Sequence, residues 1–491
     1  MRFSLYIKIK DMLTTLTEVF QYIQSGNDRE LCMQLCLDSL EFIEAINKAL
    51  NDNKNSISDR LIEQLELISE KINYFYRKYK DGSVEDCEFN ILLDEVKVVQ
   101  ILFAQDVKLV YHIVFFAELG QKWDSMKSVY DAFKKRDDCS VKVVQTPIFR
   151  AVEKEAGEIE TDVIYEDYLT HLGIKNIPYD DYDLSQELPD IGFISNPYEG
   201  VTLPQFWPEN IAKYTKLVYI PYYTEMSIND ASIQVNCELP VARHAWRIIS
   251  QSEKVKDMHV RYSLKKGENV LVTGLPKWDG MCDSIISSNK FNEEWKRKLN
   301  NKKVFLWNSH FDINSQTSTF LEYGRSIIDL FSKNEDIALI WRPHPMTDTI
   351  FKLYLPEYAD HWEESKSIVE GSGNMVLDTN NSYDIAFEFS DALISDYSSM
   401  IVQYLFTQKP ILVLQKGNGA VANTEELVQT SLLEQAKNQS DIERFITNIK
   451  KGIDENLSKR MQIISDDLPY ADGKIGEQVC HLLLAELQKQ A

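Results

Sequence analysis

Three short segments of this sequence combine residue types that bind phosphate groups, and each directly follows an apolar stretch. They are Asn308, Ser309 and His310 after KVFLW; Arg342, Pro343, His344 and Pro345 after IALIW; and Ser395, Asp396, Tyr397, Ser398 and Ser399 after ALI. Most of these residues offer hydroxyl, amide, imidazole or guanidinium groups that donate hydrogen bonds. We therefore expect the three segments to form one phosphate-binding rim.

The serine segment has the clearest anion-binding chemistry. Ser398 and Ser399 precede an apolar helical stretch, and the first turn of a helix leaves backbone N–H groups unpaired and attracts anions. The alternative is that Asp396 or Ser398 only caps the helix. Because two other polar segments follow equivalent apolar runs, we predict that Asp396, Ser398 and Ser399 belong to a substrate site.

His344 lies between two prolines, which fix the backbone on either side and remove two N–H donors. A rigid mount of this kind suits a catalytic group. The alternative is a histidine in a well-ordered turn. We predict that His344 is catalytic and that Arg342, Asn308, Ser309 and His310 contribute to substrate binding.

The elements that position these residues alternate between strands and helices. From residue 265 the apolar runs NVLVTGLP, KVFLWNS, IALIWRPHP, MVLDT, ALISDYS and PILVL are separated by helical stretches such as 320–332 and 398–406. This alternation predicts a doubly wound parallel sheet, in which ligands bind beyond the carboxyl ends of the strands. A similar alternation begins near residue 106 with KLVYHIVFFAEL, VKVVQTPIF, DIGFIS and KLVYIPYY.

Residues 1–105 are expected to be helical. Apolar residues recur there at helical spacing, for example Leu61, Leu65, Ile68, Ile72 and Phe75. Such faces need a partner surface, either the catalytic body or a second copy. We predict a helical module at 1–105, a first Rossmann-like domain at 106–264, and a second, with C-terminal helices, at 265–491.

Composition excludes several classes of function. The formal net charge of −23 argues against nucleic acid and against broad attachment to anionic lipid. No apolar run reaches the roughly 18 residues of a membrane span, and the first residues do not read as a signal peptide. We expect a cytoplasmic protein that reaches a membrane-bound acceptor peripherally, through a local patch or a partner.

The sequence also gives no reason to expect a metal or a cofactor. The seven cysteines are scattered, and Cys32 and Cys36, one helical turn apart, have no second pair to complete a metal site. No Asp-x-Asp pair follows a predicted strand. The expected phosphate site therefore relies on neutral donors, Arg342 and His344.

The segment WRPHP, followed about fifty residues later by LISDYSSMIVQYLFTQKPILVL, resembles the C-terminal half of the CDP-glycerol glycerophosphotransferases. The resemblance extends over residues 210–440 and implies a GT-B fold, two Rossmann-like domains that face each other across a cleft. It implies that the first domain, 106–264, binds the acceptor and that the second, 265–491, binds the CDP-donor. It also implies transfer of glycerol phosphate, or of ribitol phosphate in relatives, from a CDP-alcohol to a growing polymer.

The resemblance implies roles at matching positions. His344 matches the family's histidine at the donor phosphates, and Ser398 and Ser399 match its donor-binding serines. VTGLPKWD is similar to a glycine-proline-aspartate turn between the domains, which makes Gly274 a further substrate-binding candidate. Asn308 and Ser309 lie where the family has a proline-threonine turn.

The sequence departs from the family at its presumed base, the histidine of a tryptophan-histidine-glycine-threonine motif. The matching segment here is Ile-Pro-Tyr-Tyr-Thr-Glu, residues 220–225. Because the pKa of a free tyrosine lies near 10, Glu225 is the more suitable base at neutral pH. His244 is an outside candidate, but its segment RHAWRII is expected to be a helix, on which a histidine at the surface or in the packing is the alternative. The acidic residues that the family carries after SDYSS and after PIL are also absent.

Three functions remain open at this point. The first is transfer of an alditol phosphate from a CDP-activated donor to a cell-surface polymer or lipid-linked acceptor. The second is a GT-B glycosyltransferase that uses a nucleotide sugar. The third is a non-catalytic subunit of a surface-polymer assembly complex, which docks a partner protein or a second copy through the N-terminal helices.

Overall fold

The computed structural model describes residues 1–25, 28–53, 57–81, 86–118, 120–153, 159–165, 168–282, 293–313, 317–380, 383–416, 425–468, 470 and 472–489. It divides into two compact units. One comprises Met1–Ile113, Lys134–Val141 and Leu482–Ala491, and the other comprises Val114–Phe133 and Lys142–His481. The first unit is mainly a helical bundle, and the second contains most of both large sheets.

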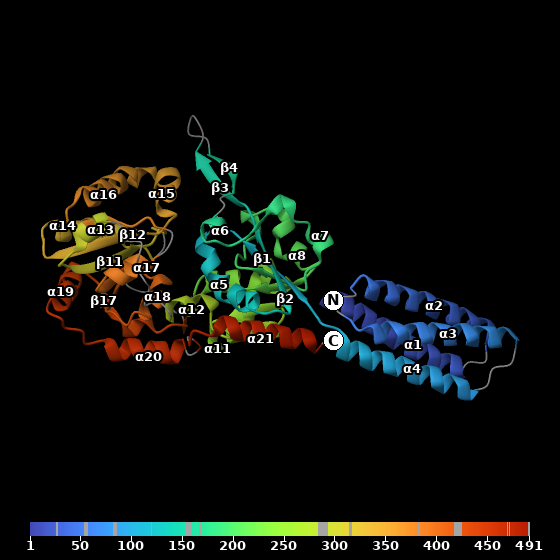
Figure 1. Ribbon diagram of the computed structural model, residues 1–491. Coiled ribbons are helices and arrows are strands. Elements are labelled where there is room, and N and C mark those ends of the chain that lie inside the picture. Colours follow the sequence, from blue (N-terminus) through green and yellow to red (C-terminus); the bar gives the residue numbers. More distant parts are fainter. Residues whose placement is uncertain are drawn as a thin grey trace. The chain divides into compact units, whose positions relative to one another are not determined.

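Four long helices run side by side in the N-terminal bundle (Figure 1). They are α1 (Phe3–Ser25), α2 (Arg29–Asn51), α3 (Asp59–Asp81) and α4 (Asp86–Asp106). On α3 the buried residues are the predicted face, Leu61, Leu65, Ile68, Ile72 and Phe75. The buried faces of the four helices form one common core. This corrects the expectation that the helical faces require the catalytic body or a second copy to cover them.

The first large sheet has seven strands in the order β10-β9-β7-β6-β1-β2-β5. Its strands are β1 (Tyr111–Ala117), β2 (Cys139–Gln145), β5 (Ile177–Pro178), β6 (Ile191–Ile194), β7 (Lys216–Tyr219), β9 (Arg247–Ser250) and β10 (Val270–Val272). The associated helices are α5 (Gly120–Lys134), α6 (Tyr168–His171), α7 (Leu184–Glu187), α8 (Pro208–Ile211), α9 (Asp230–Ile233), α10 (Pro240–His244) and α11 (Glu253–Tyr262). A separate antiparallel hairpin joins β3 (Ile148–Glu153) to β4 (Ile159–Ile164).

One strand lies in a different sheet from the one predicted. The segment NVLVTGLP was expected to open the second alternation, but its strand β10 pairs in parallel with β9, Val270 opposite Ile248. The change from one sheet to the other therefore falls after Val272 rather than at residue 264. The physical reason is that an apolar run of a parallel sheet identifies a buried strand without identifying its neighbour.

The second large sheet has six strands in the order β13-β12-β11-β14-β15-β17. Its strands are β11 (Lys303–Ser309), β12 (Ile337–Pro343), β13 (Met375–Leu377), β14 (Ala392–Ser395), β15 (Ile411–Leu414) and β17 (Glu434–Ala436). The helices are α12 (Asp279–Cys282), α13 (Glu293–Leu299), α14 (Phe320–Ser332), α15 (Thr347–Thr349), α16 (Ala359–Gly371), α17 (Asp384–Phe389), α18 (Met400–Leu405), α19 (Gln439–Lys450), α20 (Leu457–Asp467) and α21 (Ile475–Gln488). Its neighbouring strands all pair in parallel.

Each large sheet reverses its strand order at one point. In the first sheet β1 lies between β2, the next strand along the chain, and the later strand β6. In the second sheet β11 lies between β12, the next strand along the chain, and the later strand β14. Ligands of such sheets bind outside the carboxyl ends of the strands at this reversal. The expected ligand sites are therefore the ends of β1 and β6 and the ends of β11 and β14.

Contacts at several places connect the two sheets within the larger unit. The short strand β16 (Glu425–Glu426) pairs antiparallel with β8 (Ser227–Ile228). Asp279 accepts hydrogen bonds from the backbone N–H groups of Ile475 (3.0 Å) and Gly476 (2.8 Å) at the start of α21. A Cβ atom on Gly476 would lie 2.4 Å from the Ser128 carbonyl carbon, so α21 begins directly against α5 of the first sheet. The sequence had suggested that the last helix belongs to the second domain. In the structure α21 also packs on the first sheet.

Candidate active site at the ends of β11, β12 and β14

Asn308 links the three polar segments. In the sheet register it stands opposite Arg342 on one side and Ser395 on the other. Its Nδ2 donates to the backbone oxygen of Arg342 at 3.1 Å. Its Oδ1 accepts from Ser398 Oγ at 2.9 Å and from Ser395 Oγ at 3.3 Å. The structure therefore brings the three segments together at the strand-order reversal.

Asp396 lies beneath this rim and is fully buried. It accepts hydrogen bonds from the backbone N–H of His310 at 2.7 Å and of Thr319 at 3.1 Å, and also from the Thr319 hydroxyl. Burial raises the pKa of Asp396 to about 7, although the Thr319 and His310 donors act against it. This geometry makes Asp396 an anchor for the loop that carries His310, in place of the expected contact with substrate.

His344 presents a neutral hydrogen-bond donor. Its backbone N–H donates to the Ser309 oxygen at 3.0 Å, and its Nδ1 accepts from the Met346 N–H at 3.2 Å. Because Nδ1 accepts, the proton of the neutral ring resides on Nε2. Burial, and after it the charge of His310, lowers the pKa of His344 to about 4. At neutral pH the ring therefore donates a hydrogen bond without carrying charge.

His310 repeats this arrangement on the neighbouring strand. Its Nδ1 accepts from the Asp312 N–H at 3.2 Å, and burial lowers the pKa of the ring despite the opposing charge of Asp312. The His310 and His344 ring centroids are 5.6 Å apart, and Phe311 contacts both rings. Two neutral imidazoles are thus held close together at the ends of adjacent strands.

Ser309 and Arg342 are directed inward. Ser309 is fully buried, and its Oγ accepts from Trp341 Nε1 at 3.0 Å. The Arg342 guanidinium pairs with Asp378 at 2.6 Å and donates to the Asn380 oxygen at 2.9 Å. A buried pair of this kind leaves an uncompensated charge when one partner is removed. Both residues shape the rim, and Arg342 also fixes the loop after β13.

Ser398 and Ser399 differ in what their hydroxyls do. The Ser398 hydroxyl donates to Asn308, as described above, and so has its hydrogen engaged. Ser399 stands at the N-cap of α18 and makes no side-chain capping bond. Ser399 is therefore the better hydroxyl donor toward a ligand, and Ser398 holds the loop in position.

Gly274 lies away from these strand ends, between β10 and the turn Pro276–Trp278. Its φ of +83° is a conformation that favours glycine, and a Cβ there would approach Tyr470 to 2.8 Å and Ile475 to 2.9 Å. The glycine is required by this turn and by its packing on the segment before α21. This corrects the prediction that Gly274 belongs with the substrate-binding residues.

Glu225 lies after β7 of the first sheet, in a loop fixed by Gln251. Its N–H donates to Gln251 Oε1 at 2.8 Å, Gln251 Nε2 donates to its backbone oxygen at 2.9 Å, and its carboxylate accepts from Asn236 Nδ2 at 2.8 Å. Burial raises the pKa of Glu225 despite these donors. In the serine segment, burial raises the pKa of Tyr397, and the Glu225 charge contributes in the same direction. Glu225 is therefore a buried carboxyl on the first sheet whose charge acts on the serine segment of the second.

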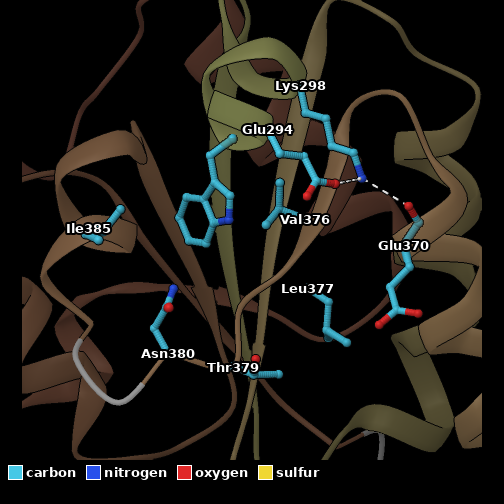
Figure 2. Close-up of a pocket in the computed structure, with 9 residues that line it drawn as sticks. Glu294, Lys298, Glu370, Val376, Leu377, Thr379, Asn380 and Ile385 are labelled. Atoms are coloured by element: carbon cyan, nitrogen blue, oxygen red, sulfur yellow. Dashed lines mark hydrogen bonds and ion pairs between the residues drawn. The ribbon is translucent and has the colours of Figure 1, made fainter. Parts of the chain in front are cut away.

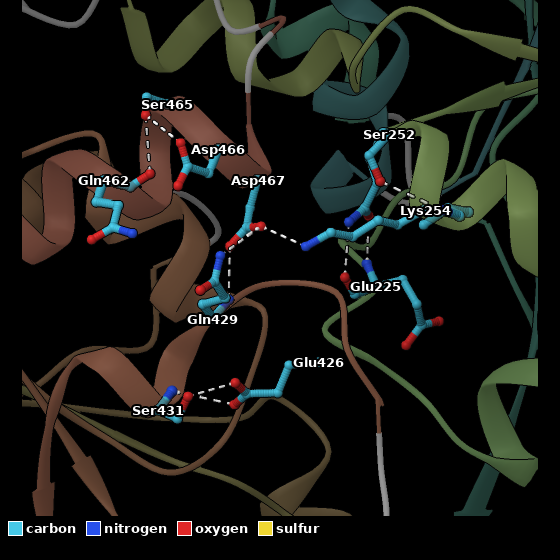
Figure 3. Close-up of polar contacts among 12 residues, drawn as sticks. Glu225, Ser252, Lys254, Glu426, Gln429, Ser431, Gln462, Ser465, Asp466 and Asp467 are labelled. Atoms are coloured by element: carbon cyan, nitrogen blue, oxygen red, sulfur yellow. Dashed lines mark hydrogen bonds and ion pairs between the residues drawn. The ribbon is translucent and has the colours of Figure 1, made fainter.

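Ionic and backbone contacts hold the two sheets together beside Glu225 (Figure 3). Lys254 of α11 pairs with the buried Asp467 at 2.8 Å, and Asp467 also accepts from the Gln429 N–H at 2.8 Å. Together with the β8–β16 pairing, these contacts fix the segment after Glu225 against the second sheet.

A pocket of about 300 Å³ is lined by residues of α13, β13 and the loop after β13 (Figure 2). Its apolar wall includes Val376, Leu377 and Ile385, and Trp295 lies beside them. Its polar groups come from Thr379 and Asn380 and from the charged residues Glu294, Lys298 and Glu370. The backbone oxygen of Asn380 accepts from Arg342. The pocket is therefore connected to the rim through the loop after β13.

Sequence reasoning missed several residues that the structure places at or behind this site. Thr319 and Asp378 each bind one of the predicted residues, and Asn380 joins the rim to the pocket. The signal for Asp378 was available, because it directly follows the strand MVL in the same way that the recognised residues follow theirs. Thr319 had no such signal, since it precedes a helix far from Asp396 in the chain.

No group of three or more His, Cys, Asp or Glu side chains in the described ranges is arranged to hold a metal ion. Among the helices that the structure describes, none has both the length and the apolar character to cross a membrane.

The sequence of this chain is similar to those of known proteins. The family model described as "CDP-Glycerol:Poly(glycerophosphate) glycerophosphotransferase" matches residues 235–485. The teichoic acid glycerol-phosphate primase of Bacillus spizizenii (strain ATCC 23059 / NRRL B-14472 / W23) is 22% identical over 399 residues, which cover 72% of this chain and 94% of the primase.

Solved structures share the two-sheet architecture. The S. aureus MnaA–UDP co-structure has a TM-score of 0.53 and 14% identity, with 77% of this chain and 97% of the other covered. A putative UDP-N-acetylglucosamine 2-epimerase from Listeria monocytogenes has a TM-score of 0.52 and 12% identity, with the same coverage. These likenesses confirm the predicted GT-B fold.

The family model matches more than half of the residues of this chain. The chain therefore belongs to the CDP-glycerol:poly(glycerophosphate) glycerophosphotransferase family.

Proposed function

We propose that this glycerophosphotransferase binds the pyrophosphate of CDP-glycerol at the rim formed by the ends of β11, β12 and β14. The observation that carries the proposal is the single Asn308 side chain, which hydrogen-bonds to both neighbouring strand-end segments. The acceptor is a hydroxyl of a cell-surface polymer or of a lipid-linked precursor. Family membership supports this function over the nucleotide-sugar and non-catalytic alternatives.

The reaction exchanges one phosphorus–oxygen bond for another. The acceptor oxygen attacks the phosphorus that carries glycerol, and the bond from that phosphorus to the oxygen of CMP breaks. Negative charge develops on the departing CMP phosphate. The Nε2–H groups of His344 and His310 are donors that stabilise this charge, and their neutral state at rest avoids the cost of desolvating a cation.

The acceptor proton requires a base, and we assign that role to Glu225. Its carboxylate accepts from neutral donors, and burial raises its pKa toward the working range of a general base. The pairing of β8 with β16, which holds the segment after Glu225 against the second sheet, supports a position for Glu225 on the side of the donor rim. The proton of the acceptor hydroxyl passes to Glu225 as the new phosphorus–oxygen bond forms.

The pocket beside Asn380 has the size and lining to take the cytidine of the donor. Its volume of about 300 Å³ lies at the lower end of small-molecule sites. Apolar side chains form one wall, and Thr379 and Asn380 offer hydrogen bonds for the edge of a base. We expect Ile385→Trp, which fills this pocket, to weaken CMP binding at least about tenfold in calorimetry.

A matched substitution controls for the added indole. Leu321→Trp introduces the same side chain at an exposed position of α14 and should leave CMP affinity unchanged. Equal CMP affinity of Ile385→Trp and the wild type would place cytidine elsewhere.

The serines should determine donor affinity more than rate. Replacing both Ser398 and Ser399 with alanine removes one positioning bond to Asn308 and one hydroxyl donor. Such groups contact the pyrophosphate in both the ground state and the transition state, so their loss mainly raises KM. We expect the KM for CDP-glycerol to rise about tenfold, with a smaller change in kcat.

The control for this double variant is Ser390→Ala. The Ser390 hydroxyl is buried against Tyr404 at 2.9 Å and does not take part in the rim. If the double variant kept the wild-type KM for CDP-glycerol, these serines would have no part in donor binding.

Helix α4 carries a strip of exposed apolar residues. Along α4, Ile91, Val98 and Ile101 are 55%, 38% and 55% exposed, at spacings that bring them to one side of the helix. We propose that a second copy or a partner protein covers this strip and brings the enzyme to a membrane-bound acceptor.

The function is tested by measuring CMP release from CDP-glycerol by the full chain with and without a short glycerol-phosphate oligomer. We expect release that depends on the oligomer, together with elongation of the oligomer by one unit. Tight binding of UDP-sugars without any binding of CMP would contradict the proposal.

A further inference from the structure

The first sheet carries a second polar cluster at its own strand-order reversal. Glu118 follows β1, and Ser195 and Asn196 follow β6. The Glu118 carboxylate accepts from Asn196 Nδ2 at 2.6 Å and from Lys122 Nζ at 2.6 Å. The Glu118 side chain is only 7% exposed, so these two donors hold it in one orientation. Ligands of doubly wound sheets bind at this position.

The hydroxyl of Ser195 has no partner. The residue is 2% exposed, and its Oγ is buried without a hydrogen bond. It lines a cavity of about 10 Å³ together with Glu118, Asn196 and Tyr198. That volume is about the minimum that holds one water molecule or one hydroxyl group. A buried polar group left unpaired is costly, which points to an occupant that pairs with it.

Contacts through two tyrosines connect the cavity to the proposed base. The ammonium of Lys122, which pairs with Glu118, lies 4.9 Å from the Tyr222 ring centroid. The Tyr222 and Tyr223 ring centroids are 5.2 Å apart, and the Tyr223 hydroxyl donates to Asn236 Oδ1 at 3.2 Å. Asn236 in turn donates to the Glu225 carboxylate, so one chain of contacts joins Glu118 to Glu225.

We infer that the cavity formed by Ser195, Glu118 and Asn196 binds a hydroxyl of the acceptor's terminal polyol unit other than the hydroxyl that reacts. The inference rests on the proposed function, because it assigns a specificity subsite to the acceptor of that reaction. Ser195 and Glu118 provide acceptors for the hydroxyl hydrogen, and the Ser195 hydroxyl donates to its oxygen. An acceptor that lacks this second hydroxyl leaves the buried groups unpaired and is used less well.

The test compares two acceptor probes with the full-length enzyme. One is glycerophosphoglycerol, and the other is its analogue with a terminal 1,3-propanediol, which keeps the primary hydroxyl and lacks the secondary one. We expect the wild type to prefer the first in kcat/KM by about tenfold, as one hydrogen bond provides. Ser195→Ala should lose this preference, mainly through KM for glycerophosphoglycerol, while the KM for CDP-glycerol stays the same.

Ser195→Ala suits the test because the hydroxyl it removes makes no bond within the protein, so the fold should be retained. The matched control is Ser125→Ala, at an equally buried serine whose hydroxyl already donates to the Lys122 oxygen at 2.6 Å. This control should keep the tenfold preference.

The outcomes separate the subsite from the function itself. An unchanged preference in Ser195→Ala, or no preference in the wild type, would show that the cavity holds a structural water only and would overturn the subsite. In either case transfer and CMP binding would still support the proposed function. A wild type that neither binds CMP nor transfers glycerol phosphate would overturn the function and the subsite together.

Discussion

His344→Ala is expected to lower kcat at least about 100-fold while the protein remains folded. The ring donates from Nε2, because its Nδ1 accepts from the Met346 N–H. A donor aimed at charge that develops on the leaving phosphate stabilises the transition state more than the ground state. The measurement is CMP release under saturating CDP-glycerol and acceptor. His244→Ala, at an exposed histidine of α10, is the control and should keep the wild-type rate.

A second substitution distinguishes a hydrogen bond from proton transfer. Because the pKa of His344 is lowered to about 4, the resting ring is neutral, and the hydrogen bond is the expected contribution. His344→Gln places an amide donor near the position of Nε2 but cannot supply a proton. We expect this variant to be faster than His344→Ala. A wild-type rate in His344→Ala would remove the histidine from the mechanism.

Glu225→Gln is expected to lower kcat by about 100-fold or more, the usual contribution of a general base. The amide keeps an oxygen that accepts from Asn236 Nδ2, so the loop should keep its conformation. Donor binding should be unchanged, because Glu225 acts on the acceptor.

The pH dependence gives an independent check on Glu225. A base must be ionised to act, so the wild-type rate should fall as the pH drops through its pKa, which burial raises above the ordinary value. The variant should lose this acidic decline together with most of its rate. Glu209→Gln, at an exposed glutamate, is the control. A variant that kept the full rate at every pH would exclude Glu225 as the base.

The parts of the fold that were predictable are those with long, strongly patterned segments. The predicted helix 320–332 is the helix α14, and the runs KVFLWNS and IALIWRPHP contain β11 and β12. The segment RHAWRII was expected to be helical, but its second half forms the strand β9 (Arg247–Ser250). A strand of four residues has too few positions for a period to identify it. The strand β17, only three residues long, was missed for the same reason.

For the candidate site, the sequence located the strand ends but not the directions of the side chains. Asn308, His344 and Ser398 come together because parallel strands end at one edge of the sheet. Whether a residue at that edge faces a ligand or the interior depends on hydrogen bonds to distant segments. Asp396 turns inward to Thr319, and Arg342 turns inward to Asp378. Thr319 and Asp378 lie far along the chain from the residues that they bind, so no local sequence pattern predicts these contacts.

The packing of α21 on α5 has a consequence for synthesis on the ribosome. The last strand of the first sheet ends at Val272, yet the helix that begins at Ile475 and places Gly476 against Ser128 is made about 200 residues later. At the usual 5–20 residues per second this interval is on the order of 10–40 s. During that time the α5 surface that receives α21 lies uncovered on the nascent chain. The N-terminal half of the enzyme therefore has to persist without its final helix, in reach of chaperones, until the second half is complete.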